Sequence, residues 1–457
     1  MTHANPRPPG YVLWAARTLE DAGYETWAVG GAIRNTLLGI PTGDWDLATR
    51  APPAAVLRLF PRTVPVGIEH GTVGVLTREG VLLEVTTFRK DVETFGRKAV
   101  VEFADTLEED LSRRDFTVNA VAWHPLSGRF QDPFGGRQDL EKGLLRTVGD
   151  PRERFAEDYL RVLRGLRFSG RFRFRIDDPA WDAIRSSTGE LGILSPERIR
   201  EELMKVLSGD PRPSGALALY RLSGVLGALY PEVAATEGCT RPNGGEEDLW
   251  THTLLLTDSL PARRPLLRLA ALFHGVGIPE GGYEGAGAPG EGGQDTSSRG
   301  RDRAAALMIR LRFSNAEIRA VTELIGAGME APLQLEAPSG LRRWLHRADP
   351  DNLPSLARIW AAKARLDRLR RGEDPASVAE IIHRLRGEVR SGAPIRSGEL
   401  AMNGRDLISM GLRPGPRFKD ILGALMERVL DDPDLNRPEL LRRMALEWLT
   451  DGKGGEA

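Results

Sequence analysis

The sequence is poor in cysteine, since Cys239 is the single one among 457 residues. One thiol excludes an intramolecular disulfide and a cysteine-rich zinc site, and it favours the reducing conditions of the cytoplasm. Long hydrophobic runs are missing as well, because none reaches the roughly 20 residues that a membrane-spanning helix needs. The opening stretch, MTHANPRPPG, contains no apolar core of signal-peptide length. We therefore expect a cytoplasmic protein that does not enter a membrane.

An excess of one charge is also lacking, because 63 Lys and Arg stand against 64 Asp and Glu. Such a balance produces no overall field that would attract a nucleic acid, so any basic surface has to be local. The length of 457 residues is sufficient for about three domains with ample hydrophobic core.

The most informative stretch covers residues 26–49, TWAVGGAIRNTLLGIPTGDWDLAT. Its first four residues form an apolar run typical of a strand, Gly30 and Gly31 predict a tight turn, and a short helix follows. Two adjacent glycines let backbone N–H groups approach an anion closely, and the positive end of the helix points to the same place. The pattern predicts a seat for phosphate.

Two aspartates follow on the next predicted strand, residues 45–48. Asp44 and Asp46 are two positions apart, so both carboxylates leave the same face of a strand and can share divalent ions. A phosphate seat facing paired aspartates suits two-metal phosphoryl or nucleotidyl transfer. The alternative is an ordinary turn followed by a polar edge strand, which Gly-Gly alone would favour.

The combination of Gly-Gly and Asp-x-Asp resembles the nucleotidyltransferase superfamily of polymerase β type. Many of those relatives continue their glycines as Gly-Gly-x-x-Arg-Asp, whereas this chain has Arg34 followed by Asn35. Superfamily members also place a third carboxylate on a later strand, and Glu84 in VLLEVTTFR is the candidate. Alternatively, Glu84 is held by a basic neighbour such as Arg89.

Residues 107–122, LEEDLSRRDFTVNAVA, predict a helix, and residues 90–103 before it predict a mobile loop. Asp115 and Asn119 are four apart, on one helical face, where they can bond a ribose hydroxyl, and an adjacent arginine can hold phosphate. A solvated charged face with an internal ion pair is the alternative.

The segment EDYLR, residues 157–161, places an acceptor and a planar donor three positions apart, Asp158 and Arg161. Cytosine and adenine each present an amino donor beside a ring-nitrogen acceptor, which this pair complements. Uracil and guanine present the opposite order and would leave both side chains unpaired, a cost sufficient to reject them. The alternative is a surface ion pair between Glu157 and Arg161.

RRDFTVNAVA looks like the second signature of the tRNA nucleotidyltransferases, the CCA-adding enzymes of the bacterial and eukaryotic class, and of the related bacterial poly(A) polymerases. The similarity continues through residues 130–168. It implies addition of C, C and A to a tRNA 3′ end from CTP and ATP, with two Mg²⁺ ions. By resemblance, the nucleotide contacts are Arg113, Arg114, Asp115 and Asn119; the protein template is Asp158 and Arg161, supported by Glu157 and Arg164; the triphosphate lies on Gly30, Gly31 and Arg34; and the metal and catalytic residues are Asp44 and Asp46.

Basic residues gather between positions 146 and 175, where nine arginines face four acidic residues and predict a phosphate track for the RNA. A helix over 195–209, SPERIREELMKVLSG, is expected to brace this neck and not to touch substrate. Arg413, Arg417 and Lys419 near the C-terminus either touch the tRNA backbone or form a solvated face.

From residue 211 onward the pattern is helical. His252 and His274 lie in segments that resemble the HD metal phosphohydrolases, whose second site is a His-Asp metal pair. Gly275 stands in the place of that Asp, so we expect packed or surface histidines and no catalytic metal site. Residues 281–300, rich in Gly, Glu and Ser, predict a disordered loop.

The sequence thus predicts an α+β fold: a small mixed α/β head of polymerase β type, followed by helical parts. The expected domains are the catalytic head, 1–147; the nucleotide-selecting neck, 148–240; a degenerate HD-like body, 241–335; and a tRNA-binding tail, 336–457. A poly(A) polymerase, and an enzyme that adds only CC or only A, are the alternatives within the class. An HD phosphohydrolase is disfavoured by Gly275, and a non-catalytic RNA-binding protein would require loss of Asp44 or Asp46.

Overall fold

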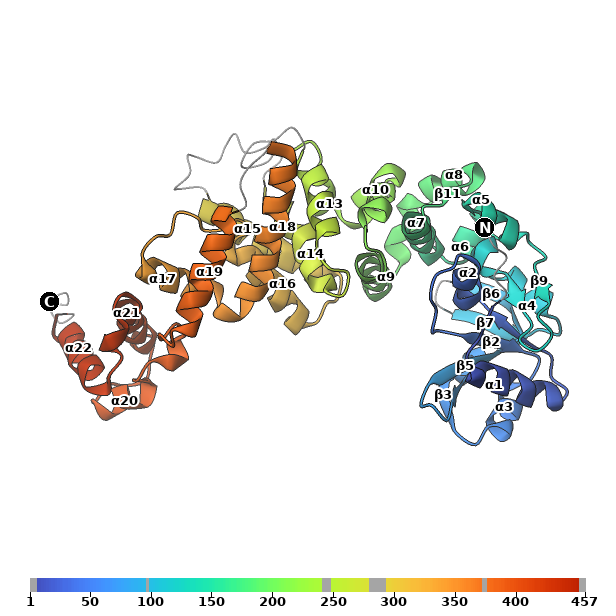
Figure 1. Cartoon of the computed structure of the whole chain (residues 1–457), viewed down its shortest axis with the longest axis horizontal. Helices are drawn as coiled ribbons and strands as arrows, with labels where there is room; N and C mark the ends of the chain where they lie inside the picture. The colour runs from blue at the N-terminus through green and yellow to red at the C-terminus, as the bar shows by residue number, and fades with distance from the viewer. Residues whose placement is uncertain (1–5, 96–97, 241–247, 279–292, 372–375, 452–457) are drawn as a thin grey trace. The chain divides into compact units, whose positions relative to one another are not determined.

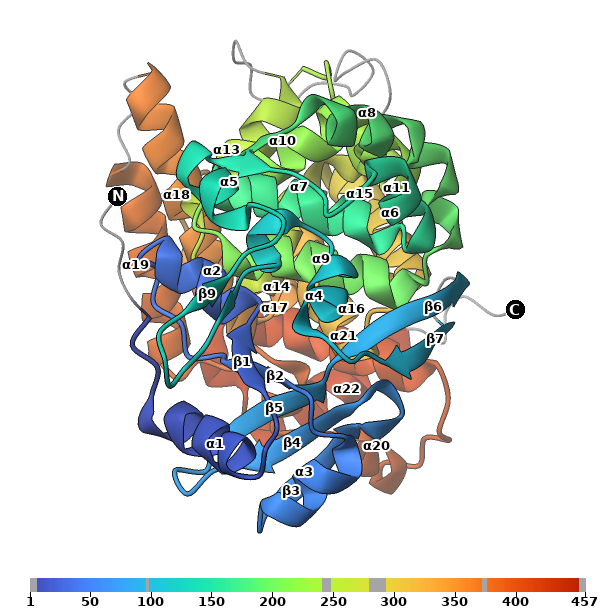
Figure 2. The ribbon, with the colours of Figure 1, turned by 90° about the vertical axis from the view of Figure 1, so that its right-hand side faces the viewer.

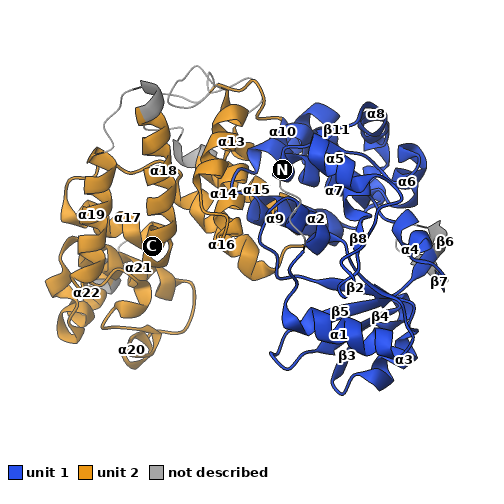
Figure 3. Cartoon of the chain, turned by 45° about the vertical axis from the view of Figure 1, so that its right-hand side comes forward, with its two compact units in different colours: residues 1–234 blue, residues 235–457 orange. Residues whose placement is uncertain are grey.

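The computed structural model of the chain describes residues 6–95, 98–240, 248–278, 293–371 and 376–451. They form two compact units, Met1–Ala234 and Ala235–Ala457, drawn in blue and orange in Figure 3. Figure 1 colours the chain from blue at the N-terminus to red at the C-terminus and labels many of its helices and strands. The finer division into head, neck, body and tail stays a prediction.

A mixed seven-stranded sheet forms the centre of the head (Figure 2). Its neighbouring strands are antiparallel except β2 and β5, which run parallel. The first two strands agree with the sequence to within one residue. Across the sheet the order is β3 (Thr63–Gly67), β4 (Thr72–Leu76), β5 (Leu82–Thr87), β2 (Asp46–Thr49), β1 (Thr26–Val29), β8 (Ala122–Trp123) and β9 (Phe130–Gln131).

Both faces of this sheet are covered, because side chains alternate along each strand. In β1, Ala28 belongs to one buried cluster, whereas Trp27 and Val29 belong to the other. The first cluster includes residues of α1 (Gly10–Asp21), α2 (Gly31–Leu37) and α3 (Pro53–Leu59). The second includes residues of α4 (Leu107–Ser112). In Figure 2, α1 and α3 accordingly lie on one side of the sheet and α4 on the other.

Two segments of the head differ from the sequence-based expectation. Residues 90–103 are not a loop, because β6 (Arg89–Phe95) and β7 (Lys98–Phe103) pair as an antiparallel hairpin. The run Ala99–Val101 has β-branched residues, and that preference outweighs the flanking charges that suggested a loop.

The continuous helix predicted over residues 107–122 is also wrong. The helix α4 ends at Ser112, and only residues Thr117–Asn119 form a further, 3₁₀ turn. The Thr117 N–H donates to the carbonyl of Arg146 at 2.9 Å instead of to a residue four positions back. A partner from a later segment therefore replaces the helical hydrogen bond, which no local pattern reveals.

Helices complete the first unit, and α7 packs against both α9 and α10. In order they are α5 (Gly136–Lys142), α6 (Pro151–Glu157), α7 (Leu160–Phe172), α8 (Asp178–Ser186), α9 (Pro196–Gly209), α10 (Ser214–Ser223), α11 (Val225–Leu229) and α12 (Pro231–Ala234), with a short parallel pair β10 (Leu144–Leu145) and β11 (Arg175–Ile176).

The second unit is helical throughout its described residues. Its helices are α13 (Leu249–Ser259), α14 (Pro265–Phe273), α15 (Gly293–Arg310), α16 (Asn315–Ala327), α17 (Pro338–Ala348), α18 (Leu353–Arg371), α19 (Ala376–Arg390), α20 (Gly404–Ser409), α21 (Arg417–Asp431) and α22 (Pro438–Asp451).

The loop predicted over 281–300 is wrong for its last part, since α15 begins at Gly293; residues 281–292 lie outside the described residues. Two of the breaks between helices in the second unit have local causes. Ser314 starts α16 with a capping box, and Pro350 cannot continue α17. No helix in the described ranges is both long and apolar enough to cross a lipid bilayer.

Candidate active site

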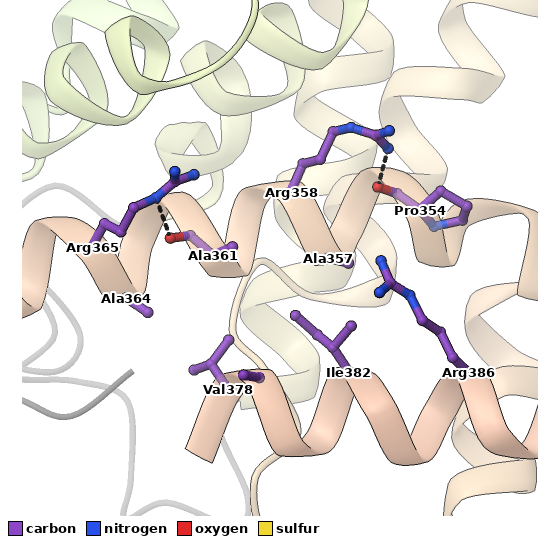
Figure 4. Close-up of a pocket in the computed structure, with 10 residues that line it drawn as sticks. Pro354, Ala357, Arg358, Ala361, Ala364, Arg365, Val378, Ile382 and Arg386 are labelled. Atoms are coloured by element: carbon purple, nitrogen blue, oxygen red, sulfur yellow. Dashed lines mark hydrogen bonds between the residues drawn. The ribbon is translucent and has the colours of Figure 1, made fainter. Parts of the chain in front are cut away.

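Two cavities differ sharply in chemistry. A groove of about 570 Å³ in the second unit lies between α18 and α19 (Figure 4). Its described lining has four alanines, three arginines and no carboxylate. Arg358 and Arg365 donate hydrogen bonds to carbonyls of their own helix. A cavity of about 740 Å³ in the first unit is lined instead by many charged side chains of both signs. This second cavity is the candidate active site.

The cavity in the first unit brings together most of the residues that the sequence singled out. Those it gathers are Gly30, Gly31, Arg34, Asp44, Asp46, Arg113, Arg114, Asp115, Asn119, Asp158, Arg161 and Arg164. Glu157 contacts its wall through Arg161, whereas Glu84 is not among the lining residues.

The Gly30-Gly31 turn is closely surrounded by charged side chains. Gly30 has φ +73°, a conformation that side chains rarely adopt, and a Cβ there would lie 3.2 Å from Arg114 Nη1 and 3.7 Å from Asp46 Oδ2. A Cβ on Gly31 would lie 3.6 Å from Arg34 Nη2. The turn is therefore open to a ligand from the cavity but has little room for a side chain.

Asp46 is the first residue of β2 and is half-buried, whereas Asp44 lies two residues before the strand and is exposed. The strand that was predicted to carry both carboxylates therefore carries only Asp46. Asp46 is in register with Glu84 on the parallel neighbour β5. Burial, and then the negative charges of Asp44 and Glu84, raise the pKa of Asp46 to about 6. Carboxylates that repel one another in this way favour a bound cation, and oxygen ligands suit Mg²⁺. These residues therefore fit a magnesium site, and the role of Glu84 as a third ligand stays a prediction.

Asp110 fixes the two arginines beside the turn. Arg113 donates to its Oδ1 and Arg114 to its Oδ2, at 2.8 and 3.1 Å. Although burial acts to raise it, Arg114 and Arg113 hold the pKa of Asp110 below its ordinary value. The carboxylate thus stays ionised and orients both guanidinium groups; it lies on α4, and its role was not foreseen from the sequence.

The side chains of Asp115 and Asn119 are in contact, although the two residues do not lie on the single helix that was predicted. Asn119 Nδ2 donates to Asp115 Oδ1 at 2.9 Å, and Arg164 Nε donates to Asp115 Oδ2 at 2.7 Å. Burial of Asp115 opposes ionisation, but Arg164 and Asn119 lower its pKa to about 2. The solvated charged face given as the alternative is wrong for Asp115, because this carboxylate is buried and pairs with Arg164 of α7 in the cavity wall; η2 (Thr117–Asn119) supplies Asn119.

Arg34 is nearly enclosed, with 6 % of its surface exposed. Its guanidinium lies between the rings of Phe168 and Phe172, 4.9 and 4.7 Å from their centroids. The two rings belong to α7 and stack on one another. The sequence analysis did not single out either phenylalanine, and no spacing pattern indicates their contact with a cation.

The helix that was expected to carry both Asp158 and Arg161 is not continuous, because α6 ends at Glu157 and α7 begins at Leu160. Asp158 follows the last residue of α6, and its Oδ1 accepts from the Leu160 N–H as α7 begins. Arg161 donates to Glu157 and to the carbonyls of Arg154 and Arg113. The ion pair with Glu157 therefore exists, but Arg161 also lines the cavity beside Asp158.

Sequence reasoning placed the arginines of α9 in a bracing role, yet Arg198 reaches the cavity. Its Nη2 donates to Asp158 Oδ2 at 2.6 Å. Arg167, Arg171 and Lys205 line the same space. Arg198 is 40 positions from its partner, so no spacing rule could connect the two.

His252 and His274 of the second unit lie side by side. His252 is buried on α13, and its ring lies 6.1 Å from that of His274. A Cβ on Gly275 would lie 2.8 Å from Leu249 Cδ2, so core packing occupies the space of the missing side chain. No group of three or more His, Cys, Asp or Glu among the described residues is arranged for a metal ion.

The basic cluster of the tail lies at the start of α21. Arg413, Arg417 and Lys419 are all exposed. This exposure is equally compatible with RNA contact and with a solvated face, so contact with RNA stays a prediction.

Comparison with known proteins gives matches over almost the whole chain. Residues 26–146 match the family described as the poly A polymerase head domain, and residues 173–236 match a probable RNA and SrmB binding site of polymerase A. A CCA-adding enzyme of Geobacillus stearothermophilus is 34 % identical over 440 residues, covering 95 % of this chain and 96 % of the relative. A CCA-adding enzyme of Geobacillus kaustophilus is 33 % identical, covering 96 % and 98 %.

A solved structure agrees with these matches. The crystal structure of a Bacillus stearothermophilus CCA-adding enzyme in complex with CTP has a TM-score of 0.73 and 29 % identity, covering 99 % of this chain and 100 % of the other. The α+β fold with a mixed head and helical remainder is confirmed.

Proposed function

The chain belongs to the CCA-adding enzymes, whose head domain is that of the poly(A) polymerases, and from this membership we propose its reaction. It adds C, C and A to the 3′ end of tRNA from CTP and ATP without a nucleic-acid template. In each step the 3′ oxygen of the RNA attacks the α-phosphorus, the bond from that phosphorus to the bridging oxygen breaks, and pyrophosphate leaves. Its location is the cytoplasm, as the low cysteine content favours.

One observation supports the proposal most strongly: the glycine turn, the two aspartates and the base-complementary pair Asp158 and Arg161 line one cavity. A triphosphate on Gly30 and Gly31 lies beside Asp46. Mg²⁺ ions, when bound, acidify the attacking hydroxyl and balance the charge of the departing pyrophosphate. Asp44 and Asp46 would hold them.

The nucleotide-binding roles follow from the hydrogen bonds already present. Asp115 and Asn119, fixed to one another, are placed to bind the ribose, and Arg113 and Arg114 are held by Asp110 to receive phosphate oxygens. These side chains orient the nucleotide, which converts a bimolecular reaction into one between fixed groups.

Base selection falls to Asp158 and Arg161. The carboxylate accepts from the amino group of cytosine or adenine, and the guanidinium donates to the adjacent ring nitrogen. Uracil and guanine would leave buried polar groups unpaired, which costs ~1–3 kcal/mol for each group. Glu157 supports Arg161 by an ion pair. Arg164, to which the resemblance gave a supporting role, pairs with Asp115 instead.

The test uses purified protein and tRNA transcripts that end before CCA, after C, and after CC. Each is incubated with magnesium and labelled CTP or ATP, and products are resolved at single-nucleotide length. Complete CCA from CTP and ATP, abolished by Asp44→Ala, supports the proposal. Arrest at CC, or extension of the CC transcript alone, would make this a partial enzyme; long A tails on unrelated RNA would make it a poly(A) polymerase. No incorporation would refute the reaction.

A further inference from the structure

Asn35 has no role in the reaction proposed above, but its side chain accepts hydrogen bonds from that of Arg34. Its Oδ1 accepts from Arg34 Nε at 3.2 Å and from Arg34 Nη2 at 2.9 Å. Asn119 Oδ1 accepts from the third nitrogen, Nη1, at 2.5 Å. Every nitrogen of the Arg34 guanidinium is thus held by an uncharged amide oxygen.

No carboxylate among the described residues forms an ion pair with Arg34. The nearest acid that influences it, Asp115, is engaged by Arg164 at 2.7 Å. The rings of Phe168 and Phe172 cover the guanidinium, but they add no net charge. Arg34 is therefore a buried cation without an ion-pair partner of its own among the described residues, and its direct contacts are amide dipoles and π faces.

The surroundings of Arg34 increase this excess of positive charge. Burial, and then the neighbouring cation Arg171, lower its pKa to about 10, with Arg167 and Arg164 acting in the same direction. At neutral pH the side chain still carries its proton. A buried, oriented and uncompensated cation attracts an anion more strongly than a solvated one does, because the effective dielectric is lower.

This charge lies at the glycine turn. The Nη2 atom that Asn35 holds is the atom 3.6 Å from the Cβ position of Gly31. Asn35 thus fixes which edge of the guanidinium faces the turn, from a helix, α2, that begins there.

We propose that the neutral amide of Asn35 is a determinant of triphosphate affinity: it positions Arg34 beside Gly31 without neutralising its charge. The inference rests on the proposed function in one respect, that the triphosphate occupies this turn. It assigns Asn35 a positioning role, since the residue acts through Arg34.

Two substitutions at position 35 separate charge from orientation. Asn35→Asp keeps an oxygen acceptor of the same size but adds a carboxylate, which pairs with Arg34 and repels phosphate. Asn35→Ala removes the acceptor and adds no charge. Asn315→Asp serves as the matched control, because it adds the same charge at an exposed position on α16, outside the cavity.

Affinity is measured by calorimetric titration with CTP, CMP and inorganic triphosphate, in magnesium and without tRNA. For Asn35→Asp the Kd for CTP and for inorganic triphosphate should rise about tenfold, as expected for one added charge at close range in a partly shielded site. The Kd for CMP should change much less, because it lacks the outer phosphates. Asn315→Asp should bind like the unmodified protein.

The direction of the change in CTP affinity shows whether Asn35 acts through its lack of charge or only by orienting Arg34. If orientation alone mattered, Asn35→Asp would bind CTP as tightly as the unmodified protein or more tightly, and only Asn35→Ala would bind it more weakly; unweakened binding by Asn35→Asp overturns the proposal. An equal loss for CMP and CTP also overturns it. Unchanged thermal unfolding of Asn35→Asp shows that the protein remains folded.

The result of the binding experiment can be told apart from the result of the tRNA-extension assay. Weaker triphosphate binding by Asn35→Asp in a protein that extends no tRNA would support the inference and refute the reaction. Full CCA addition with unchanged CTP binding by Asn35→Asp would do the reverse.

Discussion

Asp46 is expected to destabilise the folded, metal-free protein, although its carboxylate is assigned to metal binding. Its carboxyl has a pKa of about 6 in place of 3.8, because of burial and then of Asp44 and Glu84. At about 1.4 kcal/mol for each pH unit, ionising it in the folded protein costs ~3 kcal/mol, an upper figure because the side chain is only half-buried. Asp46→Asn should therefore stabilise the metal-free protein near neutral pH while abolishing nucleotide addition.

The effect of Asp46 on the free energy of unfolding depends on pH in a defined direction. A carboxyl whose pKa is raised on folding binds more protons in the native state, so stability falls as the pH rises from about 4 to about 6 and stays low above that range. Asp46→Asn lacks this loss. The variant should resemble the unmodified protein at about pH 4 and unfold at a temperature several degrees higher at about pH 8, taking ~2–4 °C for each kcal/mol in a unit of this size.

The assay is thermal unfolding by circular dichroism at several pH values, with and without magnesium. Magnesium should raise the unfolding temperature of the unmodified protein at about pH 8 and leave Asp46→Asn nearly unaffected, because binding to the native state alone stabilises it. If the variant were no more stable than the unmodified protein at about pH 8, the assignment of electrostatic strain to Asp46 would be refuted.

Three further predictions concern other positions. Gly30→Ala should reduce nucleotide addition at least tenfold with a stability loss of ~1–2 kcal/mol, because φ +73° is strained for alanine; normal activity in primer extension would contradict this. Arg164→Met should destabilise the first unit by ~2–3 kcal/mol by leaving Asp115 buried and unpaired. Because the pKa of Asp115 is held near 2, the stability it contributes in the unmodified protein should disappear only between about pH 4 and pH 2, and acid titrations that show no difference between the two proteins would refute the assignment. Gly275→Asp should lower the unfolding temperature by its clash with Leu249 and confer no metal-dependent hydrolysis of a 2′,3′-cyclic phosphate. Ring opening to the 2′- or 3′-monophosphate would disprove this.

The features that the sequence predicts correctly are local ones. The turn at Gly30, the strands on either side and the two aspartates are set by neighbours within about twenty positions, and hydrophobic alternation places them. The resemblance to known signatures then indicated which distant segments share the cavity.

The features it misses depend on contacts between distant segments. The break after Ser112 arises because the Thr117 N–H finds its acceptor at Arg146, and Arg198 meets Asp158 from a different helix. The stacking of Phe168 on a cation needs the position of Arg34, which lies on α2. Spacing along one element cannot supply such partners.

The enclosure of Arg34 has a mechanical consequence. One guanidinium joins α2, η2 and α7, held by an amide from each of the first two and by aromatic rings from the third. Separating these elements would expose a buried cation and break its hydrogen bonds at the same time. One buried side chain therefore ties together the three elements of this cavity wall.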